Sequence, residues 1–252
     1  MHPAASDQLP SAGPLGVTRI EHRAILPSTM DLAHELAATG VAAGLLVIAD
    51  SQERGRGRNG NHWASANGAG LWMTLLERPT DAEGVSVLSL RVGLALAQGL
   101  APYVDGSVRL KWPNDVFVDT RKLAGILVEA RWREAAIDWV AIGIGINMRV
   151  PIGVANASAV RAGVTRAELL LSLLPPLRAA AAAVGVLTND ELAAWQACDA
   201  ARGRAIEAPI SGRVLGVAQD GSLRVQSVDG GSETLVRSGS LVFADGGSDG
   251  AV

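Results

Sequence analysis

The chain has 252 residues, 48% of them hydrophobic, and a formal net charge of −3. This composition predicts a folded protein with one large core and room for a small additional domain. It argues against a disordered chain and against a generally basic surface for nucleic acid. A single cysteine, the lack of a long apolar run and the lack of a secretory signal predict a protein of the reducing cytoplasm that contacts no membrane.

The first 150 residues alternate predicted strands with two predicted helices. Apolar runs and period-two patterns predict strands at residues 19–26, 44–49, 71–77, 108–112, 116–118, 122–130 and 136–148. Helical spacing predicts helices at residues 30–38, with Ser28 and Thr29 at the N-cap, and at residues 85–100. Residues 1–17 show no periodicity, so we expect a loose N-terminal arm. The pattern predicts an α+β fold with a mixed, mostly antiparallel sheet flanked by helices.

The last 90 residues change from helical to β-rich. Helices are predicted over residues 165–183, with Thr165 and Glu168 as a capping box and an interruption at Pro175 and Pro176, and over residues 189–197. Short strands predicted at residues 205–208, 213–218, 223–227, 233–236 and 240–243 indicate a small barrel of SH3 type. We therefore expect a main domain at residues 18–200, a barrel at 201–245 and a disordered tail at 246–252.

Residues 52–63, Q-E-R-G-R-G-R-N-G-N-H-W, form a segment that we call the Arg-Gly loop. Glycine lets a backbone approach a ligand closely, and arginine binds carboxylates and phosphates, so the alternation predicts a mobile loop that closes over an anion. A solvated loop that touches RNA is the alternative. Of the 22 lysine and arginine residues only Lys111 and Lys122 are lysines, and their proximity favours a functional use of the ammonium over chance.

The chain resembles the biotin protein ligases, or biotin–[acetyl-CoA-carboxylase] ligases, in four motifs that occur in the family's order. These are G-R-G-R-x-G-x-x-W at 55–63, K-W-P-N-D at 111–115, K-L-A-G-I-L at 122–127 and G-I-G-I-N at 143–147. Ser28-Thr29 also matches the start of the family's S-T-N. The resemblance covers about residues 20–150. It implies the biotin-lipoate ligase fold, which is like that of class II synthetases, with a C-terminal SH3-like barrel. Because the segment before Thr18 is too short for a helix-turn-helix module, we expect a monofunctional ligase that does not bind DNA.

The resemblance implies a two-step reaction in one site of the main domain. Biotin and MgATP would form biotinoyl-5′-AMP and pyrophosphate, and a lysine of a biotin carboxyl carrier domain of a carboxylase would then attack the mixed anhydride. Since the first step joins two anions, cationic groups must neutralise the developing charge. A homodimer through an exposed sheet edge is a further possibility.

The matching positions provide three sets of candidate residues. The candidate catalytic residues are Lys122, Arg58 and Asp115. The candidates for biotin binding are Ser28, Thr29, Met30, Gln52, Gly55, Arg56, Gly57, Arg58, Lys122 and Gly125. The candidates for ATP or adenylate binding are Arg58, Trp63, Lys111, Asn114, Lys122 and Asn147, and the metal ligands are left open. Purely structural alternatives stay open: capping for Ser28 and Thr29, turn formation for Asn114 and Asp115, a loop anchor for Trp63, and a salt bridge for Lys111.

Three departures from the family pattern keep other functions open. Met30 replaces the expected Asn, Glu53-Arg54 replaces a small or uncharged pair, and Asn61 replaces a basic residue. One rival is therefore a lipoate- or octanoate-protein ligase of the same superfamily, and another is a non-catalytic protein that binds biotin or a nucleotide.

Overall fold

The computed structural model describes residues 8–228 and 231–245, which contain a seven-stranded and a five-stranded sheet. The strands of the larger sheet are β1 (Arg19–Leu26), β2 (Leu45–Gln52), β3 (Gly70–Glu77), β4 (Val108–Lys111), β5 (Asp115–Val118), β6 (Arg121–Arg133) and β7 (Ala136–Asn147). The helices are α1 (Thr29–Ala38), α2 (Ala82–Ser86), α3 (Leu88–Leu100), α4 (Arg166–Ala182) and α5 (Asn189–Cys198).

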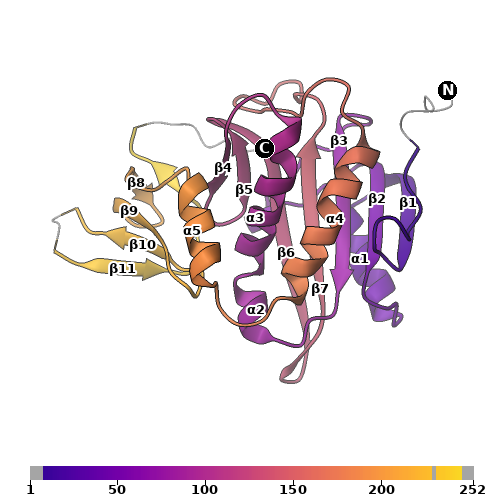
Figure 1. Ribbon diagram of the computed structural model, residues 1–252, viewed down its shortest axis with the longest axis horizontal. Helices are drawn as coiled ribbons and strands as arrows, with labels where there is room; N and C mark the ends of the chain where they lie inside the picture. Colours follow the sequence, from indigo (N-terminus) through magenta and orange to yellow (C-terminus); the bar gives the residue numbers. More distant parts are fainter. Residues whose placement is uncertain (1–7, 229–230, 246–252) are drawn as a thin grey trace.

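The larger sheet has the strand order β1-β2-β3-β7-β6-β5-β4 (Figure 1). Strands β1 and β2 are parallel, and every other neighbouring pair in this sheet is antiparallel. The prediction of a mixed, mostly antiparallel sheet flanked by helices is therefore confirmed. The parallel pair forms because α1 connects β1 to β2 and returns the chain to the same end of the sheet.

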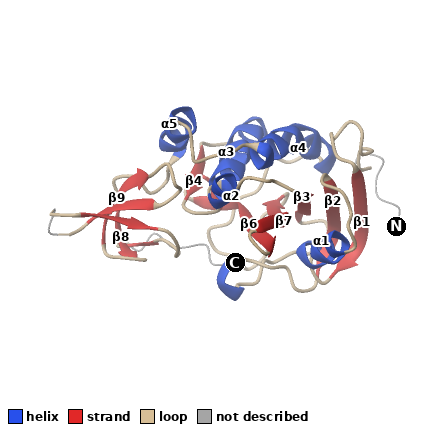
Figure 2. Ribbon diagram, turned by 90° about the horizontal axis from the view of Figure 1, so that it is seen from below, coloured by secondary structure: helices blue, strands red, loops and turns tan. Residues whose placement is uncertain are grey.

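Helices cover the two faces of the larger sheet unequally. Figure 2 shows α3 and α4 side by side on one face and α1 on the other. The main apolar core lies beneath α3 and α4, whereas α1 buries only a small cluster that includes Ala33, Val47 and Leu76. Since alternate residues of a strand point to opposite faces, half of the side chains of β5, β6 and β7 face the side that α1 leaves partly open.

Three local predictions need correction. Residues 85–100 form two helices, α2 and α3, because the backbone leaves the helical conformation at Val87. Pro175 and Pro176 lie inside a continuous α4, where burial of the neighbouring leucines against the core outweighs the lost backbone hydrogen bonds. Leu15 is fully buried, so the described part of the expected loose arm packs on the core. Residues 1–7 and the predicted tail at 246–252 lie outside the described residues.

The five-stranded sheet follows α5 and continues the apolar core. Its strands are β8 (Ala205–Ala208), β9 (Gly212–Val217), β10 (Leu223–Gln226), β11 (Glu233–Val236) and β12 (Val242–Phe243), in the order β11-β10-β9-β8-β12. It lies next to the β4 end of the larger sheet (Figure 1). Val214, Val225 and Leu241 belong to the main core cluster, and the Trp112 indole N–H donates to the Gly221 carbonyl at 2.9 Å. The five strands occur close to their predicted positions, while SH3-type closure stays a prediction.

Arg91 on α3 holds the connection between α4 and α5. Its side chain is only 2% exposed, contacts Glu191 at 2.8 Å and donates to backbone carbonyls, including those of Gly185 and Val186. We expect Arg91→Met to lower the free energy of unfolding by about 3 kcal/mol, because the carbonyls and Glu191 lose a buried cation. Urea unfolding measures this change. Arg224→Met, which breaks a similar but exposed pair with Glu233, should change little, and equal effects would contradict the prediction.

Candidate active site

The site begins with one row of paired residues that crosses the larger sheet. Backbone pairing connects Lys111 on β4 to Asp115 on β5, then to Gly125 on β6, Gly145 on β7 and Trp72 on β3. Paired residues of neighbouring strands point to the same face, so this row lies on the open face of the sheet. The row thus places two charged groups at one end and two glycines in the centre.

Trp63 at the end of the Arg-Gly loop covers the glycine centre. A Cβ at Gly125 would lie 2.7 Å from a Trp63 ring carbon, and one at Gly145 would lie 2.4 Å from the indole nitrogen. A Cβ at Gly143, in the next row, would lie 2.7 Å from the Met30 methyl group. These distances explain why the sequence needs glycine here. The loop anchor foreseen for Trp63 is therefore present.

The Arg-Gly loop is closed by its own backbone hydrogen bonds. The Trp63 amide donates to the Gly55 carbonyl and the Gly57 amide to the Asn61 carbonyl, both at 2.8 Å. Gly55 lies beneath the loop, where a Cβ would be 2.4 Å from the Trp63 carbonyl oxygen. The loop therefore has a defined conformation, and the expectation that it is mobile without ligand stays a prediction.

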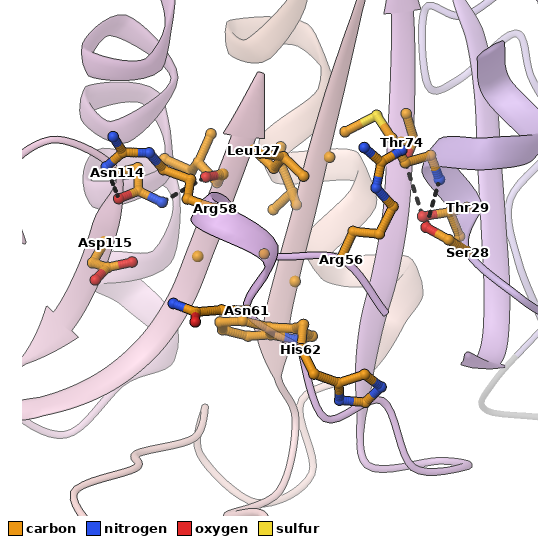
Figure 3. Close-up of a pocket in the computed structure, with 18 of the residues that line it drawn as sticks. Ser28, Thr29, Arg56, Arg58, Asn61, His62, Thr74, Asn114, Asp115 and Leu127 are labelled. Atoms are coloured by element: carbon orange, nitrogen blue, oxygen red, sulfur yellow. Dashed lines mark hydrogen bonds between the residues drawn. The ribbon is translucent and has the colours of Figure 1, made fainter. Parts of the chain in front are cut away.

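A cavity of about 200 Å³ lies between the loop and the open face of the sheet. Figure 3 shows Arg58 directed toward Asn114 at one end, and Arg56 on the side of Thr29 and Thr74 at the other. The lining residues are Ser28, Thr29, Met30, Gln52, Arg56, Gly57, Arg58, Asn61, His62, Trp63, Met73, Thr74, Lys111, Asn114, Asp115, Lys122, Gly125, Ile126, Leu127, Gly143, Ile144, Gly145 and Ser240.

The Arg58 end of the cavity concentrates cations. The Lys122 ammonium is 3.0 Å from an Asp115 oxygen and 5.1 Å from the centre of the Trp63 ring. Arg58 donates to the Asn114 side chain at 3.3 Å and to the Gly239 carbonyl at 3.2 Å. Burial lowers the pKa of Arg58 from its ordinary value, and Asp115 acts against this shift. This end is suited to binding a polyanion.

Lys111 extends the cationic end toward the five-stranded sheet. It is 6% exposed, and its ammonium lies 6.0 Å from the Phe117 ring centre and 5.2 Å from that of Phe243. Burial lowers its pKa to about 8, while nearby Asp115 raises it. Both lysines of the chain thus line one cavity, which supports the functional interpretation of their proximity.

The other end of the cavity is formed by neutral polar groups. The Thr74 hydroxyl donates to the Thr29 hydroxyl at 2.9 Å, and Thr29 donates to the Gln52 side-chain oxygen at 3.1 Å. The Gln52 amide in turn donates to Ser65 at 2.7 Å. Ser28 caps α1 by accepting the Met30 amide hydrogen at 3.2 Å. Hydroxyl and amide groups held this way suit an uncharged polar ligand.

The structure separates the candidate residues that line the cavity from those that do not. Gly55 and Asn147 are absent from the described lining, whereas every other candidate is part of it. Asn147 is buried and donates to the carbonyls of Lys122 and Ser158 at 3.3 and 3.0 Å, so it supports the backbone that carries Lys122. Its expected contact with an adenylate is not supported by this position.

Several lining residues were missed by sequence reasoning. Thr74 had a signal, since it is a polar residue within an otherwise apolar predicted strand. Ser240 had none, because its place at the cavity depends on how the five-stranded sheet packs against the larger one. Within residues 8–228 and 231–245, no cluster of three metal-ligating side chains occurs and no helix is long and apolar enough to cross a membrane.

Comparison with known proteins gives consistent matches. The model of the biotin/lipoate A/B protein ligase family matches residues 23–147. The bifunctional ligase/repressor BirA of Bacillus subtilis is 40% identical over 125 residues, which cover 49% of this chain and 38% of the relative. A biotin–[acetyl-CoA-carboxylase] ligase of Mycobacterium tuberculosis is 36% identical over 148 residues, covering 56% and 53%. The chain therefore spans about half the length, or less, of these relatives.

A solved structure extends the likeness to most of the chain. The biotin protein ligase from Aquifex aeolicus in complex with biotin and ATP aligns with a TM-score of 0.69 at 23% identity, covering 89% of this chain and 97% of that one. At this identity the likeness establishes the fold, including the arrangement of sheet and helices.

The glycine centre generates a first prediction for the site. Gly145→Ala should lower the free energy of unfolding by about 1–3 kcal/mol, because the new methyl group forces Trp63 off the sheet. Urea unfolding and near-ultraviolet circular dichroism of the tryptophans would measure both effects. Gly93→Ala on α3 is the control, since a Cβ there meets its nearest atoms at an ordinary 3.5 Å. Equal behaviour of the two variants would contradict the seating of Trp63.

Lys111 generates a prediction about pH. Because its folded pKa of about 8 lies below the ordinary 10.5, the unfolded chain binds the extra proton between these values. The contribution of Lys111 to the free energy of unfolding should therefore rise with pH in this window, by up to about 1.4 kcal/mol per pH unit, and be constant below it. Urea unfolding of wild type and Lys111→Met tests this.

The difference in the free energy of unfolding between wild type and Lys111→Met separates the contribution of Lys111 from that of Cys198. Burial raises the pKa of Cys198 to about 11. The free energy of unfolding therefore falls as the pH rises from the ordinary thiol pKa toward this value, in wild type and in Lys111→Met alike. Parallel pH profiles of wild type and Lys111→Met would show that Lys111 is not perturbed.

Proposed function

We propose that the protein is an ATP-dependent biotin protein ligase, because residues 23–147 match the model of the biotin/lipoate A/B protein ligase family. It activates biotin as biotinoyl-5′-AMP and transfers the biotinoyl group to a lysine of a biotin carboxyl carrier domain. The observation that carries the proposal is the two-ended cavity under the Arg-Gly loop, with neutral polar groups at one end and Lys122, Arg58 and Lys111 at the other.

The two ends suit the two substrates. The aligned ligase structure from Aquifex aeolicus holds biotin and ATP, and one from Leishmania major holds biotinyl-5-AMP. In this chain, Ser28, Thr29 and Gln52 provide hydroxyl and amide groups for the uncharged ureido ring, and Met30 with Gly143 forms an apolar wall beside them. The triphosphate then lies at the cationic end.

In the first step, a biotin carboxylate oxygen attacks the α-phosphorus of ATP, and the bond from this phosphorus to the pyrophosphate oxygen breaks. Lys122 and Arg58 neutralise the charge that accumulates as the two anions meet. Asp115 orients Lys122 through the 3.0 Å ion pair, and Asn114 orients Arg58. Lys111 and Trp63 complete the nucleotide end of the cavity.

In the second step, the neutral amine of the acceptor lysine attacks the acyl carbon, and the bond to the AMP oxygen breaks. The amine loses a proton to solvent, and AMP leaves as an anion beside Lys122. The Arg-Gly loop shields the mixed anhydride from water until the acceptor arrives. Gly55 and Gly57 allow the loop backbone to approach the ligand, and Gly125 leaves space for Trp63.

A magnesium ion fits this site as a companion of the nucleotide. Magnesium usually takes one or two carboxylates together with phosphate oxygens and water. Asp115 is the carboxylate among the described lining residues, so it is the group that would hold the ion. The ion would supply neutralisation of the phosphate charge.

Three further assignments belong to the same proposal. The five-stranded sheet closes as an SH3-like barrel, and the protein acts in the cytoplasm. The homodimer would use β1, which is an edge strand of the larger sheet.

A panel of acyl substrates tests the proposal. Purified protein with MgATP should release pyrophosphate and retain an acyl adenylate with biotin, and then label a carboxyl carrier domain. Release of pyrophosphate with lipoate or octanoate alone would replace the biotin assignment by the rival ligase. Tight biotin binding without pyrophosphate release would establish the non-catalytic alternative.

Lys122 provides the mechanistic prediction. Lys122→Ala should slow adenylate formation at least about 100-fold, because the ammonium that neutralises the reacting anions is lost. Pyrophosphate release in a single turnover measures this rate. Arg121→Ala, which removes an exposed neighbouring cation, is the matched control and should retain activity. A wild-type rate in Lys122→Ala would refute the assigned role.

A further inference from the structure

Glu129 on β6 binds two groups with its two carboxylate oxygens. One oxygen accepts a hydrogen bond from Arg56 at 2.5 Å, and the other contacts His34 Nε2 at 2.9 Å. Its side chain is 22% exposed, and it faces the open side of the sheet, since it follows Gly125 and Leu127 at intervals of two residues. Glu129 therefore connects an arginine of the Arg-Gly loop to a histidine on α1.

Trp139 fixes the orientation of His34. The indole N–H donates to His34 Nδ1 at 2.9 Å, and since an indole can only donate, Nδ1 must accept. The ring proton then resides on Nε2, which donates it to Glu129. His34 is mostly buried, with 12% of its side chain exposed, and burial lowers its pKa although Glu129 acts against this. Trp139, His34 and Glu129 thus form a chain of hydrogen bonds in which Trp139 donates to His34 and His34 donates to Glu129.

Arg56 connects this chain of hydrogen bonds to the Arg-Gly loop. Its guanidinium also contacts Asp31 of α1 at 3.0 Å, so it joins α1 to β6 while lining the cavity. Glu129 itself is absent from the described lining of the cavity and lines an adjoining hollow together with loop residues 54–62. Glu129 contacts the cavity lining through Arg56.

We infer that Glu129, oriented by His34 and Trp139, is a positioning residue that holds Arg56 and thereby keeps the Arg-Gly loop closed over the acyl end of the cavity. This inference rests on the proposed function, because retention of the adenylate is the property that the closed loop would serve. Loss of the Glu129 carboxylate should free Arg56, open the loop and release the adenylate early.

The matched control is a second carboxylate with the same kinds of partner. Asp50 contacts His22 at 2.8 Å and Arg166 at 2.6 Å, in the same sheet but without a contact to the loop. Glu129→Gln and Asp50→Asn each remove one charge from a histidine–carboxylate–arginine set. In Glu129→Gln, the side-chain oxygen can still accept, but the NH2 group can only donate, so it faces a donor of either Arg56 or His34.

The first measurement needs no substrate. Hydrogen exchange of the Gly57 and Trp63 amides, which form the loop's own hydrogen bonds, should be about tenfold faster in Glu129→Gln than in wild type, and unchanged in Asp50→Asn. Trp139→Phe should accelerate exchange less but in the same direction, because His34 loses only its orientation. This variant also keeps the test valid if Glu129→Gln folds poorly. Exchange equal to wild type in both Glu129→Gln and Trp139→Phe would overturn the inference.

The second measurement asks whether Glu129 acts through Arg56. Release of preformed biotinoyl-AMP should be about tenfold faster in Glu129→Gln, and Glu129→Gln should add nothing in an Arg56→Ala background. Additive effects would show that Glu129 acts by another route and would overturn the inference. Failure of wild type to form any adenylate would instead refute the proposed function, while the exchange measurement would still decide the role of Glu129.

Discussion

The contact of Trp63 with the bare backbone of two neighbouring strands is the constraint on which the site depends. An aromatic ring can lie this close to a sheet only where paired positions lack side chains, and Gly125 and Gly145 are direct partners on β6 and β7. The ring fixes one end of the Arg-Gly loop and provides a surface near which the Lys122 ammonium lies. The glycines are thus needed for the loop as much as for the sheet.

Arg56 and Arg58 connect the Arg-Gly loop to segments that are distant in sequence. Arg56 contacts α1 and β6, whereas Arg58 contacts Asn114 and the Gly239 carbonyl. Gly239 precedes β12, so the five-stranded sheet takes part in holding the loop. This contact gives a physical reason for the small sheet to be packed against the larger one, since the cavity is lined on that side by Ser240.

Sequence patterns predicted what depends on local periodicity and on short motifs. The strand at residues 19–26 and the capping box of α4 occur where expected, and most candidate residues line one cavity. Two features depend on packing and left no local signal: the approach of Ser240 and the structural position of Asn147. The contact of Glu129 with Arg56 also left no local signal, because it requires the register of the sheet.

The distribution of charge around the cavity determines which end suits which kind of ligand group. The described lining includes four cations, Arg56, Arg58, Lys111 and Lys122, and one carboxylate, Asp115. Arg56 is paired from outside the lining with both Asp31 and Glu129, so its end has no excess of positive charge. At the other end, Asp115 faces three cations, and the excess positive charge is partly buried. A polyanion gains most there, because screening by water is weak, while a neutral polar ring loses least at the Arg56 end. A chain with a net negative charge can therefore offer a local site for a polyanion without a generally basic surface.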